Sequence, residues 1–263
     1  MRATPGKPII VYTIGKTGSS TVLATLARHV PDRPVYQVHH LQPHRVTRSA
    51  RHYRSLPTPI APDHVVAAQY LSRHRPPTPD EPWDVITLVR EPVAQDVSVF
   101  FQVGERRGFF ALDDDGRLRQ PASIDELHER FGTWRDHEDD VRFFDEELAP
   151  SLGIDVYAQP FDPAAGTARY DGGRARVLLL RNEDLHQVGS SALGAFLGIE
   201  PPELVAANVG AEKRYADVYA EFRSRPLPEE LVDRLQRSRL ARHFYRPEEL
   251  EAARAAWLHP SPH

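Results

Sequence analysis

Short apolar runs alternate with segments of helical periodicity along most of the chain. Runs rich in β-branched residues predict strands at 8–12, 35–41, 83–90 and 175–181. Helical spacing predicts a helix at 22–30, and Glu91-Pro92 opens another that runs to about residue 103. Strands that alternate with helices predict a three-layer α/β fold with a mostly parallel sheet.

The rest of the chain is more polar and gives weaker signals. Residues 42–82 contain eight prolines and predict mostly loop, with one helix around 63–73. The stretch 104–172 predicts helices near 123–132 and 138–148 and a strand at 156–159. Further helices are predicted near 190–197, 213–223, 228–237 and 247–257, which makes the C-terminal part helical. We expect a single domain over 1–263, with loop-rich insertions at about 42–82 and 104–172.

Composition narrows the classes of protein that fit. No apolar run reaches the length of a transmembrane helix, and residues 1–12 lack the apolar core of a signal peptide. The expected location is therefore the cytoplasm, without membrane insertion. With no cysteine, disulfides and thiolate chemistry are excluded, and a formal net charge of −4 argues against a nucleic-acid partner.

The segment Thr13–Thr21 (TIGKTGSST) joins the first predicted strand to a helix. Strand, glycine-containing turn and helix together direct backbone N–H groups at an anion on the helix N-terminus. Lysine occurs only at Lys7, Lys16 and Lys213, and arginine supplies the other basic residues. Lys16 is thus a candidate for a task that needs a compact point charge. The alternative is a structural turn that caps the helix through Ser19 or Ser20.

The loop differs from a nucleoside-triphosphate loop. Gly15-Lys16-Thr17 matches the end of a Walker A motif, but Ile10 stands where the motif needs its first glycine. Two strands end in Arg90 and Arg181, where an aspartate would hold magnesium. We therefore expect a smaller anionic group and no metal.

A second anion-binding element follows the strand at 83–90. Arg90 stands at the expected strand end, and Ser98 lies about two turns into the next helix. A guanidinium fork and a hydroxyl can converge on one phosphate. The alternative is that Arg90 pairs with Glu91 while Ser98 faces solvent.

These motifs, in this order, resemble the donor-binding motifs of PAPS-dependent sulfotransferases. The resemblance rests on Lys-x-Gly-Ser-Ser/Thr, on Arg-Glu-Pro-x5-Ser, on LLLRNEDL (178–185) and on SRLARHFYRPEELEAARAAW (238–257). The last segment resembles bacterial sulfotransferases labelled putative capsular polysaccharide synthesis proteins. The tryptophan-containing first motif and the C-terminal Arg-Lys-Gly-x-x-Gly motif of cytosolic small-molecule sulfotransferases are absent, so the carbohydrate-type and bacterial branches fit better.

The resemblance implies a P-loop-like fold, a donor and a set of contacts. The donor would be 3′-phosphoadenosine 5′-phosphosulfate (PAPS), with PAP as product and no metal required. The 5′-phosphosulfate would lie on Lys16, Thr17, Gly18, Ser19, Ser20 and Thr21, and the 3′-phosphate on Arg90 and Ser98. The acceptor would be a hydroxyl of a sugar, a glycolipid or a secondary metabolite.

Sulfuryl transfer needs charge stabilisation and a base. Lys16 is placed to neutralise charge on the leaving phosphate. His39 and His40 end the second predicted strand and are candidate bases, since a neutral imidazole accepts a proton near neutral pH. Successive strand residues point to opposite faces, so only one of the pair can face the site, and the resemblance favours His39. An acidic base, Glu183 or Asp184, is the alternative.

Other polar residues are assigned structural roles. Lys213, Tyr215 and Tyr219 are expected to pack a helix onto the sheet. Arg242 and His243 either close over the 3′-phosphate or face solvent, and Asp113–Gly116 (DDDG) is expected to be a solvated turn. Two functions compete with sulfuryl transfer: a P-loop kinase that uses ATP and a nucleotide-binding module without catalysis.

Overall fold

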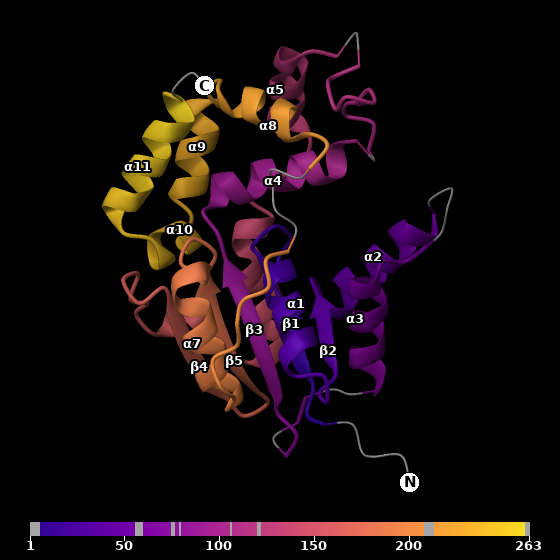
Figure 1. The fold of residues 1–263 in the computed structure, drawn as a ribbon, viewed down its shortest axis with the longest axis vertical. Helices are drawn as coiled ribbons and strands as arrows, with labels where there is room; N and C mark the ends of the chain where they lie inside the picture. Colours follow the sequence, from indigo (N-terminus) through magenta and orange to yellow (C-terminus); the bar gives the residue numbers. More distant parts are fainter. Residues whose placement is uncertain are drawn as a thin grey trace. The chain divides into compact units, whose positions relative to one another are not determined.

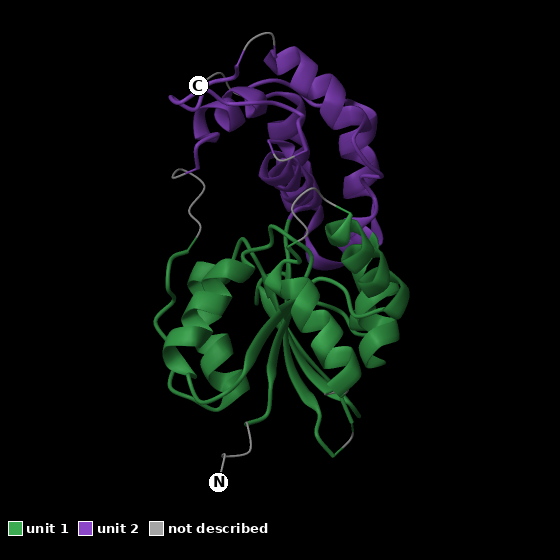
Figure 2. Ribbon diagram, turned by 90° about the vertical axis from the view of Figure 1, so that its right-hand side faces the viewer, with its two compact units in different colours: residues 1–90, 142–207 green, residues 91–141, 208–263 purple. Residues whose placement is uncertain are grey.

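The chain divides into two compact units in a computed structural model. The structure describes residues 6–55, 60–74, 77–78, 80–105, 107–119, 122–207 and 213–260. Unit 1 contains residues 1–90 and 142–207, and unit 2 contains residues 91–141 and 208–263 (Figure 2). Each unit is built from two separate stretches of chain. The expectation of a single domain over 1–263 stays a prediction.

Unit 1 is built on a five-stranded sheet of order β2-β1-β3-β5-β4 (Figure 1). Neighbouring strands are parallel except for β4, which is antiparallel to β5. This confirms the prediction of an α/β protein with a mostly parallel sheet. The strands are β1 (Ile9–Tyr12), β2 (Val35–Val38), β3 (Trp83–Val89), β4 (Thr167–Gly172) and β5 (Ala175–Arg181).

Apolar residues on alternate strand positions build the core on one face of this sheet. Ile9 and Val11, Ile86 and Leu88, and Leu178 and Leu180 belong to one buried cluster. The cluster is completed by α1 (Ser19–His29) and α7 (Leu185–Leu197), which cover this face. The opposite face contacts the segment after residue 142, where the rings of Tyr12 and Phe143 meet edge-on at 5.2 Å.

The order of the strands identifies where a ligand crevice is expected. The chain passes from β1 to β2 on one side and then back past β1 to β3 on the other. β1 therefore lies at the point where the strand order reverses, and parallel sheets bind ligands at the carboxyl ends of strands at such a point.

Unit 1 corrects four expectations about local structure. The stretch 42–82 contains two helices instead of one, α2 (Pro43–Arg54) and α3 (Asp63–His74). The second strand ends at Val38, before His39 and His40. Residues 156–159 form no strand, because η3 (Val156–Ala158) is a 3₁₀ turn capped by Asp155, and the additional strand is β4. The expected helix at 138–148 is replaced by η1 (Asp140–Arg142), the π-helix η2 (Phe144–Leu148) and α6 (Ala149–Leu152).

Unit 2 is helical and its core is aromatic. Phe100 and Phe101 of α4, Phe131 of α5 and Phe222 of α8 are all buried, with ring centroids 5.2–6.1 Å apart between helices. The helices are α4 (Pro92–Gly104), α5 (Ile124–Thr133), α8 (Ala216–Arg223), α9 (Glu229–Gln236), α10 (Arg239–Phe244) and α11 (Pro247–Leu258). The sequence predicted all of these except α10. No helix within the described ranges is long and apolar enough to cross a membrane.

Candidate functional site

The loop between β1 and α1 has an unusual backbone at two residues. Gly18, the N-cap of α1, has φ 94° and so occupies the left-handed region that favours glycine. Lys16 has φ 68°, and among the described residues it is the one non-glycine residue with positive φ. A left-handed lysine costs about 1–2 kcal/mol of local strain. A turn selected for stability alone would carry glycine or asparagine there, so the lysine side chain is the reason to suspect function.

Side chains from two neighbouring strand ends bind the carbonyl groups of this loop. Arg90 follows β3, and its Nη1 donates to the carbonyl oxygen of Lys16 at 3.1 Å. Asn182 follows β5, and its Nδ2 donates to the carbonyl oxygen of Thr17 at 3.1 Å. C=O and N–H point in opposite directions in a trans peptide, so the N–H groups of Thr17 and Gly18 face away from these two side chains.

Hydroxyl groups hold the base of the loop. The Thr13 and Thr17 hydroxyls are 2.8 Å apart, and both residues are fully buried. One of these hydroxyls donates to the other, and the second donates to a carbonyl oxygen: the oxygen of Ile14 lies 3.2 Å from the Thr17 hydroxyl, and the oxygen of Leu88 lies 3.1 Å from the Thr13 hydroxyl. The Thr17 hydroxyl is therefore committed to the protein, and what Thr17 presents outward is its backbone.

The helix after the loop begins without a side-chain cap. Ser19 and Ser20 lie inside the first turn of α1, and Gly18 is the N-cap, so the alternative that a serine caps the helix is wrong. The Ser19 hydroxyl instead accepts a hydrogen bond from Gln37 Nε2 at 3.1 Å, and Thr21 is buried. The first turn contains no acidic residue. A short anion at this helix end would meet no opposing carboxylate of the turn.

His39 lies beside the start of the same loop. Its Nδ1 is 2.5 Å from the carbonyl oxygen of Thr13, and its ring lies 4.5 Å from that of His64 between centroids. A carbonyl oxygen only accepts, so Nδ1 carries the proton. The neutral ring then has its basic lone pair on Nε2, which is the tautomer a proton acceptor needs at that atom.

His40 belongs to a different environment from His39. Its Nδ1 is 3.4 Å from Oε1 of Glu147, a fully buried carboxylate on the π-helix η2. Oε2 of Glu147 accepts from the Tyr12 hydroxyl at 2.6 Å and from the backbone N–H groups of Leu41 and Gln42 at 3.0 and 3.3 Å. Glu147 thereby fixes the segment that follows His39 and His40, so the two histidines do have different surroundings.

Hydrogen bonding decides the charge of this carboxylate. Burial raises the pKa of Glu147, but the nearby His40 and hydrogen bonds from Tyr12 and the Leu41 N–H outweigh burial and hold the pKa below its ordinary value. Burial and the nearby Glu147 raise the pKa of Tyr12 well above its ordinary value. Glu147 is therefore an ionised acceptor, and Tyr12 remains a protonated donor.

The acidic turn after β5 is also engaged. Asp184 Oδ2 lies 2.7 Å from Nε of the buried Arg181. Glu183 is exposed on the same turn. Asp184 is thus paired within its own turn, which makes it a weaker candidate for a base than the sequence alone suggested.

Several candidate residues belong to unit 2. Ser98 is half-buried on α4, whose N-cap Glu91 accepts from the backbone N–H groups of Val93 and Ala94. Tyr215 and Tyr219 contact the ring of Phe101 on α4, with centroids 5.7 and 5.1 Å apart. The expectation that these tyrosines pack a helix onto the sheet is wrong, because they pack onto another helix.

Two remaining motifs have assigned places. Arg242 is exposed and His243 half-buried on α10, also in unit 2. Asp113 closes a turn by accepting from the N–H groups of Asp115 and Arg117, as a solvated turn would. Across the described ranges, no group of three or more His, Asp or Glu side chains is arranged to hold a metal ion.

Comparison with known proteins relates part of the chain to glycan biosynthesis. Residues 116–246 match the family model described as "Putative capsular polysaccharide synthesis protein" (NKWYS). No curated protein and no solved structure matches the chain. The match covers much of 104–172, where sequence motifs had shown no resemblance. It begins after Lys16 and Arg90, so the loop and Arg90 lie outside the matched residues.

Sequence reasoning missed two residues of the candidate site: Asn182, which binds the loop after β1, and Glu147, which binds the segment after β2. Asn182 directly follows a predicted strand, and the rule that strand ends meet at one edge of a sheet could have identified it. Glu147 had no such signal, because it lies in a polar helical stretch and reaches Tyr12 only through the fold.

Proposed function

We propose that the chain is a sulfotransferase that moves the sulfuryl group of PAPS to a hydroxyl group of a glycan. The observation that carries the proposal is the loop Thr13–Gly18. Arg90 and Asn182 bind its carbonyl groups, so the N–H groups of Thr17 and Gly18 face the opposite way, beside the N-terminus of α1. A turn of this kind suits a phosphate or sulfate group.

The residues of unit 1 fit the anionic end of such a donor. Lys16 adds one positive charge to the loop, and its strained backbone indicates that this side chain has a purpose beyond the turn. Arg90 uses Nη1 on the loop, and a guanidinium has further N–H donors for the 3′-phosphate. The expected role of Ser98 at the 3′-phosphate stays a prediction, because Ser98 belongs to unit 2. The transferred sulfonate carries a single negative charge, so a lysine and backbone N–H groups can stabilise it without a metal.

Residues of this chain can stabilise the leaving group and accept the proton in the proposed reaction. The acceptor hydroxyl oxygen forms a bond to sulfur while the bond from sulfur to the 5′-phosphate oxygen breaks. The electron pair of that bond stays on the phosphate, which leaves as PAP, and Lys16 stabilises the charge. His39 Nε2 takes the hydroxyl proton, in agreement with the tautomer set by the Thr13 carbonyl.

The acceptor class rests on the similarity of residues 116–246 to the polysaccharide synthesis family. A polysaccharide offers many hydroxyl groups of the kind that sulfuryl transfer uses. Among the acceptors considered from sequence, a sugar hydroxyl is therefore the one we propose.

Thermal unfolding with PAP, PAPS, ATP and GTP, each with and without Mg²⁺, tests the proposal. We expect PAP to stabilise the protein by about 2.7 kcal/mol at a hundredfold excess over its Kd, and ATP to do much less because it lacks a 3′-phosphate. Arg90→Ala should remove most of the PAP effect. Equal stabilisation by ATP, or a requirement for Mg²⁺, would favour the kinase alternative and overturn the donor assignment.

A further inference from the structure

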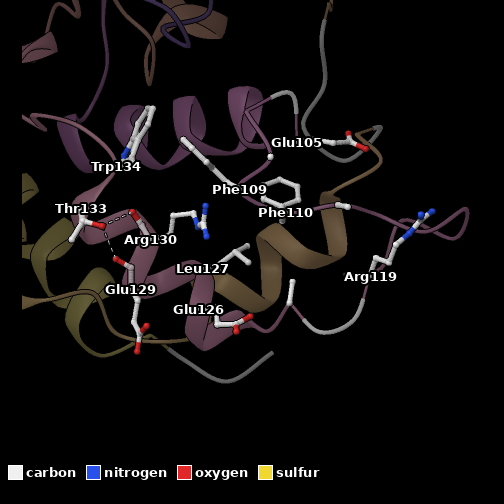
Figure 3. A pocket seen from close by; sticks show the side chains of 13 residues that line it. Glu105, Phe109, Phe110, Arg119, Glu126, Leu127, Glu129, Arg130, Thr133 and Trp134 are labelled. Carbon is white, nitrogen blue, oxygen red and sulfur yellow. Dashed lines mark hydrogen bonds between the residues drawn. The ribbon is translucent and has the colours of Figure 1, made fainter.

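Unit 2 contains a broad pocket that the proposed reaction does not use. Its volume is about 1080 Å³, slightly above the range of about 300–1000 Å³ that is usual for ligand sites in proteins. Side chains from the end of α4, the loop that follows it and α5 surround it (Figure 3). All of the lining residues belong to unit 2, so the pocket is complete within one compact unit.

One wall of the pocket is aromatic and rigid. Phe109 stacks on the fully buried Phe100 with centroids 5.5 Å apart, and Trp134 meets Phe109 edge-on at 5.8 Å. Both wall residues are half-buried, so the protein fixes their positions while part of each side chain stays accessible. Trp134 Nε1 is buried and has no hydrogen-bond partner within the described residues. Because this nitrogen is inaccessible, a ligand in the pocket can contact the ring of Trp134 but not its N–H group.

The opposite wall is polar and carries both signs of charge. Glu126 and Glu129 extend from α5, with Arg130 between them and the aromatic wall (Figure 3). The Arg130 guanidinium carbon lies 5.8 Å from the centroid of the Phe109 ring. With Glu105 and Arg119, the lining holds three carboxylates and two guanidiniums, which gives it a net charge of −1.

This combination defines the chemistry of the ligand. A sugar ring has an apolar C–H face that packs on an aromatic ring, and its hydroxyls both donate to carboxylates and accept from guanidiniums. The net negative lining disfavours a polyanion. A purely apolar ligand would displace water from the arginines and glutamates and would offer them no hydrogen-bond partner in its place. The large volume fits several sugar units in a row.

We infer that this pocket binds a neutral oligosaccharide segment of the acceptor and discriminates against its sulfated form. The choice of ligand rests on the proposed function, and it agrees with the family match, which covers α5 and the Arg119 loop. Carboxylates outnumber guanidiniums by three to two on the lining, so a sulfate group added to the glycan should weaken binding, and the pocket should favour unmodified glycan over sulfated product.

Tryptophan fluorescence of the full chain provides a direct test. Trp83 and Trp257 are buried, so Trp134 is the tryptophan that a ligand in this pocket contacts. Cellotetraose, maltotetraose, mannotetraose and N-acetylchitotetraose are titrated without donor, alongside a sulfated chondroitin tetrasaccharide. We expect a saturable fluorescence change with at least one neutral tetrasaccharide and a Kd at least about tenfold weaker for the sulfated one, equal to about 1.4 kcal/mol.

Variants connect the signal to the pocket. Phe109→Ala should weaken binding at least tenfold, and because it also removes packing on Phe100, Arg130→Gln on the exposed face of α5 is the second variant. Arg237→Gln, an exposed arginine of the same unit outside the pocket, is the matched control and should bind as the unmodified chain does. Unchanged binding in both pocket variants, no response to any neutral tetrasaccharide, or preference for the sulfated one would overturn the inference.

The glycan-binding experiment does not depend on whether PAPS is the donor. Glycan binding is measured without PAPS, and Lys16→Ala should leave it intact. Glycan binding together with no PAP binding would reject the sulfotransferase proposal and retain the pocket. PAP binding together with no glycan response would do the reverse.

Discussion

The side-chain amide of Asn182 donates to the carbonyl oxygen of Thr17 at 3.1 Å, across 165 positions of sequence. The contact leaves no room for a larger residue at Gly18, because a Cβ there would lie 2.4 Å from Asn182 Nδ2. The residue after β5 and the loop after β1 are thus in direct van der Waals contact.

Gly18→Ala should therefore damage the loop in two ways, through the clash and through the positive φ. We expect a loss of about 2 kcal/mol or more in stability and a loss of PAP binding. Asn182→Ala in the same chain should relieve the clash and restore part of the stability, whereas the strain from φ 94° remains. Gly132→Ala is the control, because it lies in α5 with open space around it and should be neutral or slightly stabilising. Equal effects of Gly18→Ala and Gly132→Ala on the melting temperature would contradict the prediction.

Lys16→Gly separates stability from activity. Glycine accepts φ 68° without strain, so the free energy of unfolding should stay the same or rise by up to about 1 kcal/mol. Loss of the ammonium group should lower kcat by at least about a hundredfold. Lys16→Asn, which also tolerates this backbone, should behave in the same way. Melting curves and turnover with PAPS check both parts, and a clearly less stable Lys16→Gly protein would show that the lysine side chain is structural.

Glu147→Gln tests whether the buried carboxylate positions the histidine pair. The amide keeps the shape but can no longer accept from all of its partners as an anion, so the loop after β2 should loosen. We expect kcat to fall by about tenfold with little change in PAP affinity, and the pH profile of kcat to shift. A normal pH profile in Glu147→Gln would limit Glu147 to a purely structural role.

His39→Ala should reduce kcat by about 10²–10⁴-fold and leave PAP affinity nearly intact.

Asp84 anchors the opposite end of the sheet. Its buried carboxylate lies 2.6–2.7 Å from nitrogens of Lys7, Arg33 and Arg176. Burial raises the pKa of Asp84, but the hydrogen bonds from these three cations outweigh burial and leave the pKa below its ordinary value. A lowered folded-state pKa gives stability that is complete above the unfolded-state value of 3.8 and is lost as the pH falls through the folded-state value.

Asp84→Asn should consequently destabilise the protein at neutral pH by about 2 kcal/mol, because a neutral amide replaces the buried carboxylate that binds three partly exposed cations. The difference from the unmodified chain should shrink as the pH falls below 3.8. Urea unfolding at several pH values measures this. A difference that is constant with pH would mean that ionisation of Asp84 does not stabilise the fold.

The sequence predicted the parallel sheet because each of its four parallel strands is a short apolar run, a pattern that is recognised without tertiary information. It missed α2 because Val46 and Ala50 are the buried residues of that helix, a weak signal among arginines and histidines. It missed β4, an edge strand in which Tyr170 is the buried residue, for a similar reason.

The same limit applies to the candidate site. The loop at Lys16 follows from the local pattern of strand, glycine and helix. The contacts of Asn182, Glu147 and His39 depend on how distant segments are brought together, and a local pattern contains no information on such pairs.

The split course of the chain has a consequence for synthesis on the ribosome. β3 pairs on one side with β1, which is made before it, and on the other with β5, which emerges only after the whole first segment of unit 2. Until then the growing chain exposes the open edge of a fully buried apolar strand, which is prone to pair with other nascent chains. Nascent unit 1 should therefore depend on chaperones until residue 181 has left the exit tunnel.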